Sequence, residues 1–289
     1  MGIHRGYRRL ARTSVVVSTA VLLLLVPTTV AGAPVQSKKT KPLPWPDKVT
    51  AKADCSGDRH ALFGGFEVDT EVPIGTGVAA WVDASAPVDK RVGQWSTTAH
   101  NDFAAEDGEV TSYAYCDTGK KPSVVKETKT MPGDEPEPVT VVAKCPKKTK
   151  LVGGGFSSNG DTETIRNVLL ISMIRGTGQS WQVSAVNEKD EAVKLTAVAV
   201  CRKQGGAKAE LSKRSADVPG NTRRSATAGC PGSTDVAFMG IIGEIQNTHN
   251  ALPVALVRVG NDKVKATAVH NSSDPDPPDG RITAIAYCR

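Results

Sequence analysis

The sequence is poor in aromatic residues and lacks the short motifs of several enzyme classes. Phe, Trp and Tyr make up 4% of the chain, which argues against a dedicated lectin that stacks sugars on exposed rings. No GxSxG or HExxH motif occurs, so neither an α/β-hydrolase nor a zinc protease is indicated. Phe156 follows the glycines Gly153–Gly155, and this run therefore lacks the GK[ST] or GxGxxG pattern of a phosphate-binding loop. We predict no catalytic residues, no cofactor and no metal site.

Long apolar runs are also missing, apart from one near the N-terminus. Four arginines precede a mostly apolar stretch from Val15 to Val30, and small residues follow at Ala31 and Ala33. This layout predicts a signal peptide over residues 1–33, cleaved after Ala31 or Ala33. The chain carries a formal charge of +6, and removal of the four arginines leaves about +2. We therefore expect a secreted, extracellular protein with neither a nucleic-acid partner nor a membrane attachment after cleavage.

The six cysteines follow the predicted signal and show no CxxC spacing, which favours disulfides over a metal site. They flank three copies of one pattern: CSGDRHALFGGF to TSYAYC, CPKKTKLVGGGF to TAVAVC, and CPGSTDVAFMGI to TAIAYC. The repeat pattern selects one connectivity among the fifteen that six cysteines allow. The predicted pairs are Cys55–Cys116, Cys145–Cys201 and Cys230–Cys288.

The repeating unit is about 85 residues long and fills the mature chain. In TAVAVC the small residues Ala197 and Ala199 alternate with Val198 and Val200, the period of a β-strand, and long helical patterns are missing. We expect an all-β fold of three tandem disulfide-stapled repeats, built as small β-sandwich-like modules packed together; a single pseudo-threefold β-prism is the alternative. The expected domains are a signal peptide at 1–33, a disordered Lys/Pro-rich tail at 34–48, and β repeats at 49–116, 117–201 and 202–289.

Other positions also align between the copies. Trp95 and Trp181 match, with Lys265 in the third copy, and we interpret both tryptophans as core residues, Trp181 covering the glycine run. The segments end at Asn101, Asn187 and Asn271, and on this alignment His100 and His270 are equivalent while Val186 replaces them in copy 2. A position that accepts valine indicates a half-buried strand residue.

The pattern C-P-x-x-T…GGGF…W-x-V-x-A-x-N…T-A-x-A-x-C resembles a repeat in poorly characterised secreted proteins of high-GC Gram-positive bacteria. The middle copy fits it best. Copy 1 lacks the proline after its cysteine, and copy 3 has Lys265 in place of the tryptophan and only Gly240 of the glycine run. The resemblance implies an exported, extracellular β-module and brings no ligand or catalytic residue with it.

Residues that break the repeat are the candidates for function. Trp81 and Trp45 are not repeated, and Trp81 is proposed to stack on a sugar. The acidic loop with Asp274, Asp276 and Asp279 occurs only in copy 3 and is a second candidate ligand-binding site.

We expect a non-catalytic binding or structural protein of the cell wall or an extracellular glycan or matrix. One alternative is an inhibitor or binder of another secreted protein that uses the copy-3 loop. The other is an extracellular hydrolase that uses His60 or His249.

Overall fold

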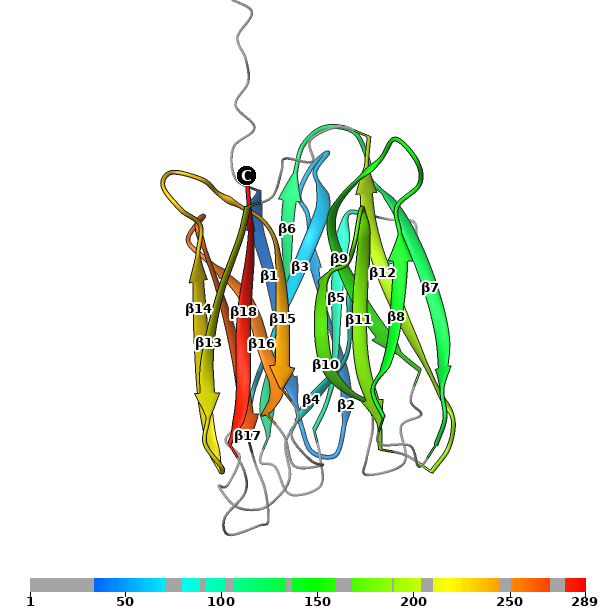
Figure 1. The fold of residues 1–289 in the computed structure, drawn as a ribbon, viewed down its shortest axis with the longest axis vertical. Helices are drawn as coiled ribbons and strands as arrows, with labels where there is room; N and C mark the ends of the chain where they lie inside the picture. Colours follow the sequence, from blue (N-terminus) through cyan, green and yellow to red (C-terminus); the bar gives the residue numbers. More distant parts are fainter. Residues whose placement is uncertain are drawn as a thin grey trace, which may run out of the picture. The chain divides into compact units, whose positions relative to one another are not determined.

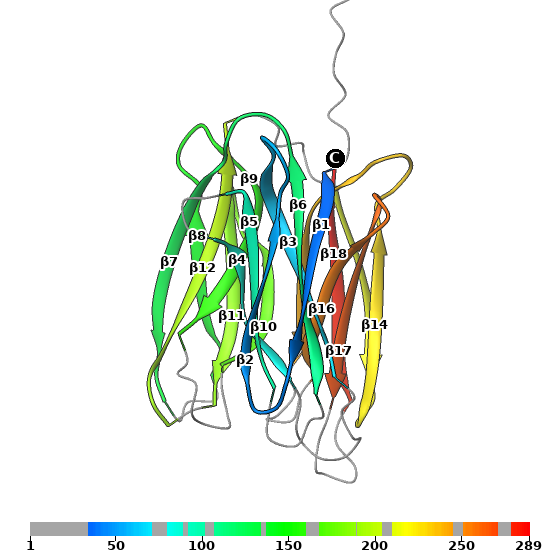
Figure 2. The same cartoon turned by 180° about the vertical axis from the view of Figure 1, so that it is seen from behind.

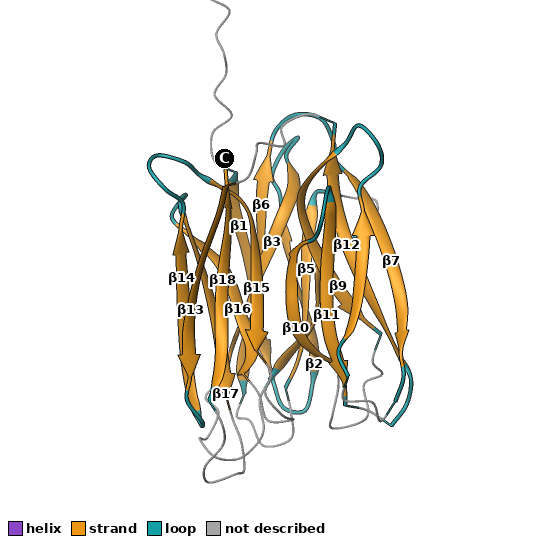
Figure 3. Cartoon of the chain, viewed as in Figure 1, coloured by secondary structure: helices purple, strands orange, loops and turns teal. Residues whose placement is uncertain are grey.

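The structure, a computed structural model, describes residues 34–70, 80–88, 92–101, 107–133, 137–159, 168–188, 190–203, 210–244, 251–270 and 279–289. Its regular elements in these ranges are all strands (Figure 3), as the all-β prediction requires. Within the same ranges, no helix is long and apolar enough to cross a membrane. The predicted signal peptide lies outside the described residues.

Each copy of the pattern supplies six strands (Figure 1). The first copy has β1 (Val35–Leu43), β2 (Lys48–Asp54), β3 (His60–Asp69), β4 (Trp81–Pro87), β5 (Gln94–His100) and β6 (Gly108–Asp117). The second has β7 (Ser123–Met131), β8 (Val139–Lys144), β9 (Lys150–Ser158), β10 (Val168–Arg175), β11 (Ser180–Asn187) and β12 (Val193–Arg202). The third has β13 (Glu210–Val218), β14 (Thr222–Gly229), β15 (Val236–Glu244), β16 (Ala251–Val259), β17 (Lys263–His270) and β18 (Gly280–Cys288).

The strands form three six-stranded sheets, and every sheet is shared by two copies. Sheet A has the order β1-β6-β3-β16-β17-β14, sheet B β2-β5-β4-β9-β12-β7, and sheet C β13-β18-β15-β10-β11-β8. In each sheet the first, sixth and third strands of one copy continue into the fourth, fifth and second strands of another. The sharing is cyclic, because copy 1 joins copy 2 in sheet B, copy 2 joins copy 3 in sheet C, and copy 3 joins copy 1 in sheet A.

Each copy is also a two-layered sandwich, because its two groups of three strands belong to different sheets. The predicted disulfides Cys55–Cys116, Cys145–Cys201 and Cys230–Cys288 are all present. Each joins the end of the second strand to the sixth strand, so each ties two sheets together. The sandwich modules and the pseudo-threefold closure predicted from the sequence therefore describe two aspects of one arrangement.

The glycine run serves two kinds of close packing. A side chain on Gly154 would place its Cβ 2.3 Å from the Trp181 ring, and Gly64 stands against Trp95 in the same way at 2.2 Å. This agrees with the prediction that Trp181 covers the glycines. One residue further on, a Cβ at Gly155 would lie 2.1 Å from the carbonyl oxygen of Ser85. Gly155 therefore permits the junction of β9 with β4, where two copies meet.

The prediction of a disordered tail over residues 34–48 is wrong for most of that range. β1 pairs along its whole length with β6, from Val35 opposite Cys116 to Leu43 opposite Gly108 (Figure 2). At the start of this strand the Arg258 guanidinium donates to the Pro34 carbonyl at 2.6 Å. β1 is an edge strand, where lysines and a proline are tolerated because one side of the strand makes no ladder bonds.

The sequence alignment of copy 3 is one residue out of register at its fifth strand. Ala53 pairs with Trp95 and Ala143 with Trp181, but the matching Ala228 pairs with Val264. Val264, and not Lys265, therefore stands at the tryptophan position.

The same shift changes the interpretation of the histidines. Asn101 Nδ2 donates to the Leu43 carbonyl at 3.1 Å, and His270 Nδ1 lies 3.3 Å from the carbonyl of Val218, which ends the matching first strand of copy 3. His270 therefore occupies the position of Asn101 and Asn187, and it is not the equivalent of His100. Asn271 lies outside the described residues.

Candidate functional site: the outer faces of the three sheets

A row of six residues, one from each strand, crosses the outer face of every sheet, and most of these residues carry a hydroxyl group. In sheet B the row reads Thr50, Thr98, Ala84, Ser157, Thr196 and Thr128. In sheet A it reads Ser225, Thr267, Ala255, Glu67, Thr111 and Thr40. In sheet C it reads Thr140, Ser184, Ser172, Ile242, Thr283 and Ser215. The two outer residues at each end are Ser or Thr in all three rows.

These terminal hydroxyls bond to each other across the strands. Thr50 and Thr98 are 2.8 Å apart at their Oγ1 atoms, and Thr128 and Thr196 are 2.9 Å apart. The four pairs in the other two sheets have the same separations, 2.8 or 2.9 Å. Each pair uses one O–H as an internal donor, and the other O–H is not used within the pair. The inner members Thr98 and Thr196 of sheet B are half-buried, whereas those of the other two sheets are buried: Thr111, Thr267, Ser184 and Thr283. The pairs also support the six edge strands, by about 0.2–1 kcal/mol each.

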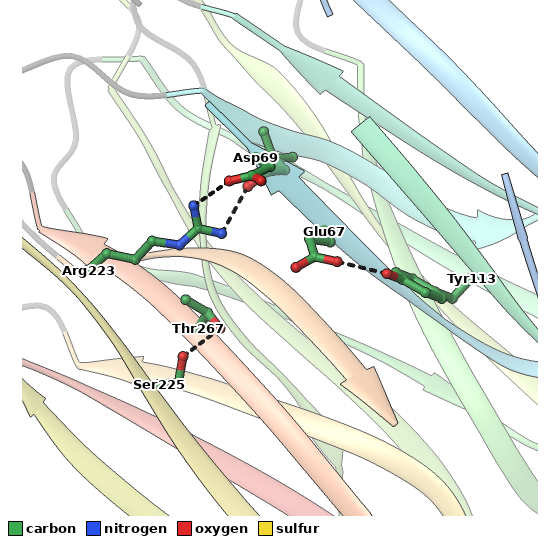
Figure 4. A network of polar contacts seen from close by, with 7 residues as sticks. Glu67, Asp69, Tyr113, Arg223, Ser225 and Thr267 are labelled. Carbon is green, nitrogen blue, oxygen red and sulfur yellow. Dashed lines mark hydrogen bonds and ion pairs between the residues drawn. The ribbon is translucent and has the colours of Figure 1, made fainter. Parts of the chain in front are cut away.

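On sheet A the row is crossed by internal polar contacts (Figure 4). Arg223 Nη1 donates to Asp69 Oδ1 at 2.8 Å, and the Tyr113 hydroxyl donates to Glu67 Oε2 at 2.7 Å. Burial and the Glu67 carboxylate both raise the pKa of Tyr113, so this hydroxyl stays protonated. Arg223, Asp69 and Glu67 are therefore engaged with partners on this face, whereas Lys38 and Lys263 are exposed on it.

On sheet B a charged group is buried at one end of the face. Asp83 lies in the β-bulge of β4 and is 3% exposed. Its carboxylate accepts the Trp81 indole N–H at 3.0 Å and forms a 3.0 Å ion pair with Lys48 Nζ. The His100 ring packs on Trp81 with centroids 4.9 Å apart. Copies 2 and 3 have apolar residues at the positions of Trp81, Asp83 and His100, so this cluster belongs to copy 1 alone.

On sheet C a hollow of about 310 Å³ lies at one end of the face, lined by Asp217, Glu244, Asp279, Gly280 and Arg281. Arg281 Nε donates to Asp217 at 3.2 Å, and Nη1 lies 3.5 Å from Glu244. Asp217 raises the pKa of Arg281 through this hydrogen bond. Arg281 thus neutralises two of the three carboxylates. In the described ranges no group of three His, Cys, Asp or Glu side chains is arranged to hold a metal ion.

The sequence-based candidates are dispersed over the molecule. Trp81 is 6% exposed, so its ring does not offer the open face that the stacking hypothesis requires. Trp45, in the turn before β2, is 43% exposed, and its backbone N–H donates to Asp107. Asp279 is exposed beside the hollow on sheet C, whereas Asp274 and Asp276 lie outside the described residues.

The hydrolase hypothesis relies on His60 or His249, each with a distant Ser or Asp. His60 is half-buried at the start of β3, and His249 lies outside the described ranges.

The hydroxyl rows are the feature that sequence reasoning missed. Part of their signal is in the sequence, because TSYAYC, TAVAVC and TAIAYC all begin with threonine. That these hydroxyls line up across the strands becomes visible only when the strand register is known. A comparison with models of protein families finds no match, and a comparison with curated proteins finds none either.

Proposed function

We propose that this chain is an exported, non-catalytic binding protein that attaches to extracellular polysaccharide, with the cell wall as its expected location. The observation that carries the proposal is the hydroxyl row that all three sheets repeat. Paired hydroxyls offer donors and acceptors in a regular line, and the hydroxyl groups of a polysaccharide are complementary to both.

The polar clusters support binding rather than catalysis. Arg223 pairs with Asp69, the Tyr113 hydroxyl with Glu67, and Lys48 with Asp83. A general acid or base must reach a substrate proton, but these groups are engaged with partners of their own.

Export is supported by the three disulfides, because such bonds persist in oxidising compartments. A scaffold in which every copy ties two sheets also holds its faces rigid, and a rigid face loses little conformational entropy when it binds. The resemblance to secreted repeat proteins points in the same direction.

Sedimentation with purified cell wall tests the proposal. The exported protein should pellet with the wall and stay in solution without it. The variant Thr50→Val/Thr128→Val/Thr140→Val/Ser215→Val removes exposed or half-buried hydroxyls from two rows and should weaken retention several-fold. A control with Thr149→Val and Thr234→Val, which lie in turns, should bind normally. If the unaltered protein stays in the supernatant with both wall and purified glycans, the proposal is wrong.

A further inference from the structure

The three outer faces have the same strand arrangement, but the residues on their two central strands differ. We call these central residues the floor of each face. At the fourth-strand position of the row, Ala255 in sheet A is 2% exposed and Ser172 in sheet C is 7% exposed. Ala84 at the same position in sheet B is half-exposed. The three sheets share one strand arrangement, so the greater exposure of this position in sheet B comes from the surrounding side chains and not from the backbone.

Neighbouring residues explain the difference. At the third-strand position of the row, sheet A has Glu67, which is bonded to Tyr113, and sheet C has Ile242. Sheet B has Ser157 there, and Ala86 is a further small residue on β4. Because these side chains are short, the middle of sheet B is a floor of small residues with hydroxyl pairs on both sides.

The floor of sheet B is bordered by lysines. Lys52 on β2 and Lys126 on β7 stand on the two edge strands, and Lys194 stands on β12 beside β7; all three are exposed. On the same face, the Asp83 carboxylate is buried and paired with Lys48, and Asp54 accepts a hydrogen bond from Gln94. Asp54 is itself exposed and keeps its charge, so the three lysines outnumber it among these exposed charged side chains.

The strands of sheet B carry none of the exposed large hydrophobic side chains of the described residues. The large hydrophobic side chains that are exposed among the described residues are Val35, Trp45, Val142, Leu211 and Val259. Four of them lie on strands of sheets A and C, and Trp45 lies in the turn before β2. Among the described residues, the strands of sheet B thus offer no exposed aromatic ring on which a nucleic-acid base could stack and no large exposed hydrophobic side chain for a protein partner.

We propose that the outer face of sheet B binds an anionic linear polysaccharide, which lies across the strands along the hydroxyl row. Six strands at about 4.8 Å spacing make the row about 24 Å long, enough for an oligosaccharide segment. The hydroxyl pairs bond to the sugar hydroxyls, and the lysines at both ends attract the acidic groups of the polymer. This inference rests on the function proposed above and adds the face and the charge of the ligand.

Equilibrium binding to four probes tests the inference: polygalacturonate, poly(glycerol phosphate), neutral dextran and a single-stranded oligonucleotide. The two anionic polymers with hydroxyl groups should bind more tightly than dextran and the oligonucleotide. Agreement between the carboxylate and phosphate polymers would mean that charge and hydroxyls suffice, whereas a preference for one would identify the acidic group. Their binding should weaken as NaCl rises, because salt screens exposed charges.

Two matched triple variants locate the site. Lys52→Gln/Lys126→Gln/Lys194→Gln should weaken binding of the anionic polymers by about tenfold or more. Lys38→Gln/Lys213→Gln/Lys263→Gln removes the same charge from exposed positions of sheets A and C and should change it by less than about twofold. Ala84→Gln, which fills the floor and keeps the charge, should also weaken binding.

Three results would overturn the inference: equal effects of the two triple variants, a preference for dextran, or a preference for the oligonucleotide. Retention on the cell wall separates this inference from the proposed function. If the Lys52/Lys126/Lys194 variant still pellets with the wall as well as the unaltered protein does, sheet B is not the site, but wall binding stands.

Discussion

Copies 1 and 2 fill their sandwich cores differently from copy 3. In the first two, a buried tryptophan lies against a glycine: Trp95 against Gly64 and Trp181 against Gly154. Copy 3 has Met239 at the glycine position and Val264 at the tryptophan position, and both are buried. The two positions have changed together, and the two pairs have similar total volumes, so the packing between the sheets is kept.

The comparison shows that glycine is required at two positions of the repeat for two different reasons. Gly64 and Gly154 are tied to a tryptophan, and copy 3 has lost both members of that pair. Gly65, Gly155 and Gly240 stand where two copies join, each against a carbonyl oxygen of the neighbouring copy. All three copies keep this second glycine because the obstacle is backbone, which a change of side chain cannot remove.

We expect the largest effect when only one residue of the copy-3 pair, the methionine, is introduced into copy 2. Gly154→Met should destabilise the protein by more than about 3 kcal/mol, because the new side chain overlaps the Trp181 ring. Adding Trp181→Val recreates the copy-3 pair and should restore part of the loss. Urea unfolding of the two variants measures both effects. A double variant that is no more stable than Gly154→Met would show that the two positions are not coupled.

A second prediction concerns the indole N–H groups of the two tryptophans. Trp95 Nε1 donates to Ser85 Oγ at 2.9 Å, whereas Trp181 Nε1 has no partner among the described residues, and Met173 stands at the position of Ser85. Ser85→Ala should cost about 1–3 kcal/mol, because it leaves a buried donor unsatisfied.

Ser96→Ala, at a half-exposed position of the neighbouring β5, is the control for that measurement and should change the free energy of unfolding by less than about 1 kcal/mol. Thermal or urea unfolding measures the difference. Equal stability of the Ser85→Ala variant and the unaltered protein would mean that the Trp95 donor finds another acceptor.

The smallest effect is expected where copy 3 substitutes a histidine for the asparagine of the other copies. His270→Asn should be tolerated within about 1 kcal/mol, because an amide N–H can donate to the Val218 carbonyl as Asn101 does to Leu43. His270→Ala removes the donor and should cost more. If both variants are equally unstable, the ring contributes by packing and not by its hydrogen bond.

The sequence predicted the features that one copy can show by itself. The disulfides followed from cysteines at matching positions, and the buried faces of the final strands followed from the alternation of Ala197 and Ala199 with Val198 and Val200. The exchange of strands between copies was harder to foresee, because each junction rests on two residue pairs, such as Ala84–Ser157 and Ser85–Phe156. Pairings this short have no signature beyond the glycine beside them.

Two errors came from signals that fit two structures equally well. Lysines and prolines between residues 34 and 48 suit a disordered linker and an edge strand alike, and only the pairing with β6 decides between them. The alignment of His270 with His100 followed the shared His-Asn dipeptide. The hydrogen bond to Val218 shows that the ring takes the place of an asparagine side chain, and such a replacement leaves no trace in a letter-by-letter alignment.

The cyclic sharing of sheets also limits how the number of copies in such a protein can change during evolution. In a linear array of repeats, a copy can be gained or lost at an end, because each copy contacts only its neighbours. Here the third and fourth strands of every copy complete the sheets of the other two, so the loss of one copy would expose two strand edges at once. The number of copies is therefore held at three while their surfaces remain free to diverge, and a single gene can carry three different faces on one scaffold.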